Sequence, residues 1–133
     1  KFNTDYLYAK SRKRSLSIKS FIMNNSIVVG IGNIYANEAL FLSGINPKLK
    51  ANKISKLRYR KLIRSIETIL SKAIDKGGTT LRDFVNGNGM PGYFSNELKI
   101  YNRAGKSCIE CKRKIKMIRQ NQRSTFYCDF CQT

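Results

Sequence analysis

The chain has 133 residues, of which 41% are hydrophobic, enough for one compact domain or two small ones with a modest core. Its 26 lysines and arginines outnumber 8 acidic residues, and the net charge of +18 calls for a polyanionic partner: nucleic acid first, with anionic lipid or no partner as the alternatives. No run approaches the roughly 20 apolar residues of a bilayer span and no signal peptide opens the chain, which excludes membrane-spanning and secreted classes and predicts a cytoplasmic protein.

Two helices separated by a turn are predicted in the first third of the chain. Residues 5–24 mix apolar and basic side chains, and the second half of this stretch has the spacing of an amphipathic helix. The segment GIGN, residues 30–33, has two glycines one residue apart, which predicts a tight turn. A second helix is predicted from Ile34 to Ser43, with Gly44 as its C-terminal cap.

The strongest helical pattern follows Pro47. Apolar residues recur every three or four positions from Leu57 to Ile74, and Ser55 is the predicted N-cap. Gly77-Gly78 is predicted to end this helix, and residues 86–92 are predicted to form a glycine-rich loop.

The composition changes near residue 103. The segment from Arg103 to Thr133 holds all four cysteines and two short alternating stretches, residues 115–118 and 125–127, that predict a β-hairpin. The expected fold is therefore mainly α, with a helical domain over residues 1–102 and a small four-cysteine β-hairpin finger over residues 103–133.

The four cysteines form two pairs with the spacing of a structural zinc site. Cys108 and Cys111, like Cys128 and Cys131, are separated by two residues, and 16 residues lie between the pairs. Disulfides and a single redox pair are the alternatives, which the missing secretion signal and the symmetric pairing disfavour. With four thiolate ligands no coordination position is left open for catalysis, and the chain has no histidine to serve as ligand or general base.

A phosphate site is predicted at GIGNIYANEALF, residues 30–41. A glycine turn before a helix presents unpaired backbone amides, and Asn33 adds a side-chain donor, although a helix hairpin without a ligand would have the same pattern. This segment resembles the helix–two-turn–helix motif of the formamidopyrimidine-DNA glycosylase and endonuclease VIII family. The resemblance continues through TTLRDF at residues 79–84, GYFSNELKIYNRAGKSC and the final RSTFYC-x2-CQ finger.

The resemblance implies which residues contact DNA. It assigns the phosphates that flank a flipped nucleotide to Asn33 and to Arg123. Gly30, Gly32 and Tyr35 of the same motif are also predicted to bind DNA. Its implied partner is double-stranded DNA with damaged bases or abasic sites, bound by a monomer in the bacterial cytoplasm, at the nucleoid, with one structural zinc.

A second implied site is the loop that closes over an extruded oxidised purine in the formamidopyrimidine branch. The matching residues are Gly89, Met90, Pro91, Gly92, Tyr93 and Phe94. Glycines allow the backbone to approach a base edge, and the two aromatic residues either stack on a base or pack beneath the loop.

No catalytic residue is predicted in this chain. Family members use an N-terminal proline and the neighbouring glutamate, whereas this chain opens with Lys1 and its prolines are internal, so we expect a fragment that lacks the N-terminal catalytic domain. The intact protein would be an oxidised-purine glycosylase with abasic-site lyase activity, and the fragment would bind without cutting. The alternatives are a non-enzymatic zinc-ribbon protein of the ribosomal or transcription type and a degenerate relative that binds without catalysis.

Overall fold

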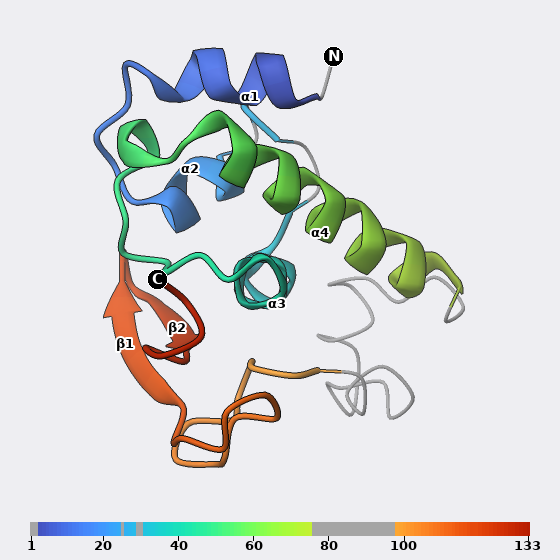
Figure 1. Cartoon of the computed structure of the whole chain (residues 1–133), viewed down its shortest axis with the longest axis vertical. Helices are drawn as coiled ribbons and strands as arrows, with labels where there is room; N and C mark the ends of the chain where they lie inside the picture. The colour runs from blue at the N-terminus through green and yellow to red at the C-terminus, as the bar shows by residue number, and fades with distance from the viewer. Residues whose placement is uncertain (1–2, 25, 29–30, 76–97) are drawn as a thin grey trace.

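The computed structural model describes residues 3–24, 26–28, 31–75 and 98–133. Helices α1 (Thr4–Ser11), α2 (Ile18–Met23), α3 (Asn33–Ser43) and α4 (Lys56–Asp75) form the first part, with a short 3-10 helix, η1 (Ala51–Lys53), before α4. A two-stranded antiparallel hairpin of β1 (Lys116–Gln120) and β2 (Arg123–Tyr127) forms the last part. In Figure 1, α1 lies at the top, α2 below it, and the hairpin at the lower left. The predicted mainly helical fold with a small hairpin is confirmed.

The first stretch contains two helices where one was predicted. The expected helix in its second half is α2, capped by the side chain of Ser17, which accepts from the Ser20 amide. The missed helix is α1, whose N-cap Asn3 accepts from the Tyr6 amide at 2.8 Å. Leu7 is its one fully buried apolar side chain, so α1 lacks the periodic stripe that marks a helix in sequence.

The predicted second helix, α3, ends as expected at Gly44. Gly44 adopts φ +75°, and its amide donates to the carbonyl oxygens of Leu40 and Phe41. A Cβ at Gly44 would lie 3.4 Å from the Cys131 carbonyl oxygen, so the finger passes close to the end of α3. The Gly44 carbonyl accepts from Arg58 and from the Thr133 amide, which ties three segments together at one residue.

Helix α4 packs along α3 and closes the apolar core of the helical part. The predicted N-cap Ser55 accepts from the Arg58 amide at 3.2 Å. Tyr59 and Leu62 are fully buried, and Tyr59 meets Phe21 of α2 edge to face with 6.2 Å between ring centroids. Within the described residues, no helix is long and apolar enough to cross a bilayer.

The hairpin has the two-residue connection that suits tightly twisted strands. Gln120 pairs with Arg123, and both connecting residues, Asn121 and Gln122, have positive φ values of 50° and 67°. Arg123 is therefore the first residue of β2, directly after the turn. The predicted division into two domains at residue 103 stays a prediction. Across that boundary, Phe41 of α3 packs in the same cluster as Phe126 of β2.

Candidate functional site

The four cysteines meet in one cluster at the base of the hairpin. Their sulfur atoms all lie within 4.8 Å of one another, with 3.9 Å between Cys108 and Cys131 and 3.4 Å between Cys111 and Cys128. A tetrahedral zinc with Zn–S bonds of about 2.3 Å requires sulfur separations of about 3.8 Å. The cluster therefore has the size and the donor set of a four-thiolate zinc site, as predicted.

The surroundings of the sulfurs also fit a cation. The amides of Glu110 and Cys131 donate to the sulfurs of Cys108 and Cys128, both at 3.4 Å. Burial raises the pKa of the Cys128 and Cys131 thiols, so without a cation these two groups keep their protons. A zinc ion would replace those protons and let four thiolates share one small volume.

Three side chains converge on the backbone carbonyl of Ser124, the residue after Arg123. Its oxygen accepts from Lys19 Nζ at 3.2 Å, from Asn33 Nδ2 at 3.1 Å and from Asn37 Nδ2 at 3.4 Å. Lys19 comes from α2 and both asparagines from α3. One backbone oxygen of β2 therefore accepts hydrogen bonds from side chains of two helices.

Asn37 and Lys19 each add a second bond to β2. Asn37 Oδ1 accepts from the Phe126 amide at 2.7 Å, and Lys19 donates to Thr125 Oγ1 at 2.6 Å. Lys19 is only 2% exposed; burial, and then the charge of Arg123, lower its pKa to about 8. At neutral pH its ammonium is still charged, and it places a second cation directly behind Arg123.

Arg123 itself is exposed and available. Within the described parts of the chain its guanidinium has no hydrogen-bond or ion-pair partner, whereas Arg12 donates to the carbonyls of Asn52, Ala51 and Ile54. A hollow of about 200 Å³ lies in front of Arg123. Its lining also includes Lys19, Ser20, Met23, Asn24, Gln120 and Asn121.

Asn33 is the first residue of α3, and its side chain bonds to the residue that follows Arg123. One of its two amide hydrogens bonds to Ser124, which leaves the second as a donor, and among the described residues its buried Oδ1 has no partner. Gly32, the N-cap, has no side chain that could bond the first amides of α3. The N-terminus of α3 and the guanidinium of Arg123 therefore offer donors on adjoining elements, an arrangement that suits an anion such as a phosphate.

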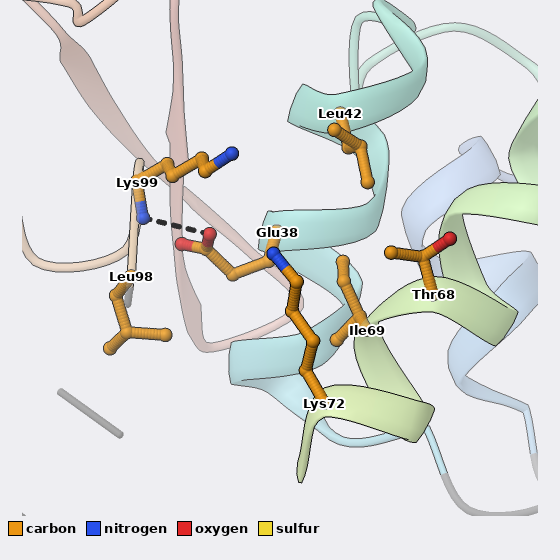
Figure 2. Close-up of a pocket in the computed structure, with 7 residues that line it drawn as sticks. All are labelled: Glu38, Leu42, Thr68, Ile69, Lys72, Leu98 and Lys99. Carbon is orange, nitrogen blue, oxygen red and sulfur yellow. Dashed lines mark hydrogen bonds between the residues drawn. The ribbon is translucent and has the colours of Figure 1, made fainter. Parts of the chain in front are cut away.

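A third polar contact joins α3 to the segment before the finger. The Glu38 carboxylate accepts from the amides of Lys99, Ile100 and Tyr101 at 2.8 to 2.9 Å. Figure 2 shows Glu38 in a small pocket of about 90 Å³ between α3 and α4, with Lys72 and Lys99 at its rim. Because its oxygens are occupied by three backbone amides, Glu38 has a structural role: it holds residues 99–101 against α3.

Comparison with protein families covers both parts of the chain. The family described as the formamidopyrimidine-DNA glycosylase H2TH domain matches residues 1–85, and the family described as the zinc finger found in FPG and IleRS matches residues 105–133. The chain belongs to the formamidopyrimidine-DNA glycosylase H2TH family. Its finger, with the four gathered cysteines, carries one structural zinc site.

Curated relatives and solved structures agree with this family. The formamidopyrimidine-DNA glycosylase of Idiomarina loihiensis is 56% identical over 131 residues, and that of Vesicomyosocius okutanii is 58% identical over 132 residues. These alignments cover 98% and 99% of this chain but 48% and 49% of the relatives, so the chain spans about half the length of the curated relatives it matches.

The solved structures are DNA complexes of the same family. A Lactococcus lactis FPG mutant bound to a Fapy-dG containing DNA matches with a TM-score of 0.87 and 34% identity, over 99% of this chain and 48% of that one. The Lactococcus lactis Fpg bound to an abasic site containing DNA matches with a TM-score of 0.84 and 32% identity, over 99% and 48%. These matches do not favour the ribosomal or transcription alternative.

The structure brings some of the predicted residues together and leaves others undescribed. Asn33 and Arg123 lie on adjoining elements, and Tyr35 is buried at 5% exposure beside Leu98. Gly30, the loop residues 89–94 and the matched segment at residues 79–84 lie outside the described residues.

Lys19 and Asn37 were missed as site residues. Each is a buried polar residue in a largely apolar helix, IKSFIM for Lys19 and NIYANEALFLS for Asn37. A polar residue within such a helix is the sequence signal that could have identified them.

Proposed function

We propose that this chain holds damaged duplex DNA as the DNA-binding part of a formamidopyrimidine-DNA glycosylase. The observation that carries the proposal is the bond between Asn33 Nδ2 and the Ser124 carbonyl, which fixes the N-terminus of α3 beside Arg123. The family match and the DNA complexes of the Lactococcus lactis proteins support the same conclusion.

In this proposal Asn33 and Arg123 bind neighbouring phosphates of one strand. Arg123 can grip a phosphate through two parallel hydrogen bonds, since its guanidinium is exposed and unpartnered in the described structure. Asn33 contributes its second amide hydrogen. Gly30 and Gly32 would shape the turn before α3, and Tyr35 of α3 would contribute to binding from its buried position beside Leu98.

The finger keeps Arg123 in place. Cys108, Cys111, Cys128 and Cys131 would hold a zinc ion, which supplies the cross-link that closes the base of the hairpin. Through β2 that cross-link fixes the strand whose first residue is Arg123. The chain divides into residues 1–102, which bind one side of the phosphates, and residues 103–133, which bind the other.

The remaining assignments rest on the resemblance. Residues 89–94 would close over an extruded oxidised purine, and removal of that base with cleavage at the abasic site would require the proline and glutamate of a domain that precedes this segment in its family. Such a protein would act as a monomer in the bacterial cytoplasm, at the nucleoid.

Binding of a duplex with one abasic site, compared with the undamaged duplex across a salt series, tests the proposal. We expect tighter binding of the abasic duplex and a steep loss of affinity with salt, because each phosphate contact releases counterions. Arg123→Ala should weaken binding about tenfold for every sequence and lower the salt slope by about 1.

Arg64→Ala is the matched control. Arg64 is an exposed arginine of α4 that does not line the Arg123 hollow, so its removal takes away the same charge from a different element. Equal affinity for the two duplexes, or an equal loss from both substitutions, would contradict the proposal and leave only generic attraction between a basic chain and DNA.

A further inference from the structure

A second basic hollow lies on α1, away from the Arg123 side chain. It has a volume of about 450 Å³ and is lined by Tyr6, Ala9, Lys10, Lys13 and Arg14. Tyr6, Ala9 and Lys10 lie on α1, and Lys13 and Arg14 follow just after its last residue, Ser11. We call these three cations, Lys10, Lys13 and Arg14, the α1 strip.

The α1 strip has no acidic counterpart in the described structure. Lys10 and Lys13 are exposed and Arg14 is half-buried, and within residues 3–24, 26–28, 31–75 and 98–133 none of them forms an ion pair. The one carboxylate of α1, Asp5, pairs instead with Lys56 of α4. Three like charges therefore sit together without neutralisation, which costs the fold free energy unless a polyanion covers them.

A contact of Tyr6, which lines the α1 hollow, reaches the turn that borders the Arg123 hollow. The Tyr6 hydroxyl donates to the Ile27 carbonyl at 3.1 Å, in the turn that follows α2. Asn24, at the other end of that turn, lines the hollow of Arg123. In Figure 1, α1, α2 and the hairpin follow one another from top to bottom, so α2 lies between the helix that carries Lys10 and the hairpin that carries Arg123.

We propose that the α1 strip is a second phosphate-binding surface, which holds the duplex beyond the nucleotides gripped by Asn33 and Arg123. The inference rests on the proposed function, since it extends the same bound duplex. Lys10, Lys13 and Arg14 fall within five consecutive residues and line one hollow. One strand of a duplex carries one phosphate per about 3.4 Å of helix axis, so cations gathered at one hollow can each meet a phosphate of the same strand.

The side chains around the α1 strip favour nucleic acid over a lipid surface. A helix that lies on a membrane inserts large apolar side chains next to its cations. The large exposed apolar residues of the described chain lie on other segments: Leu42, Leu57, Ile109, Met117 and Phe130. The α1 strip has only Ala9 and the half-buried Tyr6 beside it.

Two duplexes with the same central abasic site separate this inference from the proposed function. The short one has about one helical turn, roughly 10 base pairs, and the long one is extended by about one turn at each end. The test variant of the zinc-loaded chain is Lys10→Gln, Lys13→Gln and Arg14→Gln. The control variant is Arg60→Gln, Lys61→Gln and Arg64→Gln, three exposed cations of α4 that remove the same charge.

The wild-type chain should bind the long duplex more tightly than the short one. In the α1 variant we expect the affinity for the long duplex to fall tenfold or more and its salt slope to fall by about 2 to 3, with the short duplex bound as before. The α4 control should leave both affinities near those of the wild-type chain. Circular dichroism of each variant establishes that the fold is retained.

Several results would overturn the inference. An equal loss in the two variants would mean that only net charge acts, and an equal loss for both duplexes would place the α1 residues at the abasic site itself. Unchanged long-duplex binding in the α1 variant, with loss of binding to phosphatidylserine vesicles, would assign the strip to lipid. Failure of the proposed function is seen separately, as a wild-type chain that binds abasic and intact short duplexes equally.

Discussion

The helical part and the finger are held together by different means. In the helical part, buried apolar side chains from all four helices form one cluster, with Phe21, Tyr59 and Leu62 among its fully buried members. The finger's cluster includes two of its own cysteines and borrows Phe41 from α3. The finger thus has too little apolar volume to fold alone, and the metal site and α3 supply what it lacks.

Removing zinc should have the largest effect, and it should be confined to the finger. Structural zinc contributes about 10 kcal/mol or more in zinc-finger peptides, so a chelator should unfold residues 103–133. Helices α1 to α4 should stay folded, because their core does not include the cysteines. The expected readout is a retained helical circular dichroism signal together with complete loss of abasic-duplex binding.

Re-addition of zinc serves as the control for chelation and should restore binding, whereas magnesium should not, since its preferred ligands are oxygens. The comparison between the two parts would fail if the helical signal were lost at the same chelator concentration as DNA binding.

Leu62→Ala should have the next largest effect, in the opposite part. Leu62 is fully buried in the helical cluster, and truncation of such a leucine costs about 2–5 kcal/mol. The melting temperature should fall, while the zinc content of the folded chain stays at one ion. Leu57→Ala, on the same helix at 57% exposure, should change the melting temperature little. Loss of zinc from the folded Leu62→Ala chain would mean that the two parts form one cooperative unit.

The smallest effect is expected from the titration of Lys19, where the two parts meet. Burial lowers its pKa in the folded chain to about 8 from 10.5. Above pH 8 the folded chain releases this proton while the unfolded chain keeps it, so the free energy of unfolding should rise with pH up to about pH 10.5. At pH 9 the gain is at most about 1.4 kcal/mol.

Urea unfolding of the wild-type chain and of Lys19→Met across this pH range provides the measurement. The variant should lack the rise, and the wild-type chain should lose duplex affinity over the same range, because the cation behind Arg123 is discharged. A rise of equal size in Lys19→Met would assign the titration to another group.

The sequence predicted the features that depend on short spacing. Two residues between paired cysteines, a glycine at the end of a periodic helix and a serine before another were enough to place the sulfur cluster, Gly44 and Ser55. The resemblance added Asn33 and Arg123, whose positions on adjoining elements depend on contacts between distant segments.

Features that depend on long-range partners were not predictable in this way. Helix α1 has no apolar stripe and is held by its Asn3 cap and by Arg12, which bonds carbonyls about 40 positions further along the chain. Lys19 acquires its lowered pKa and Asn37 its role only when β2 reaches them, roughly 90 to 105 positions later in sequence. Locally, each is marked only as a polar residue within a largely apolar helix, and its partner on β2 cannot be read from that pattern.

The carbonyl of Ser124 has a mechanical consequence. It is the backbone oxygen next to Arg123, and it is tethered to α2 and α3 at the same time. A force on the Arg123 side chain would reach both helices through the Ser124 carbonyl, because Ser124 directly follows Arg123 in the chain. A displacement of the hairpin turn therefore has to move α2 and α3 together or break these three hydrogen bonds.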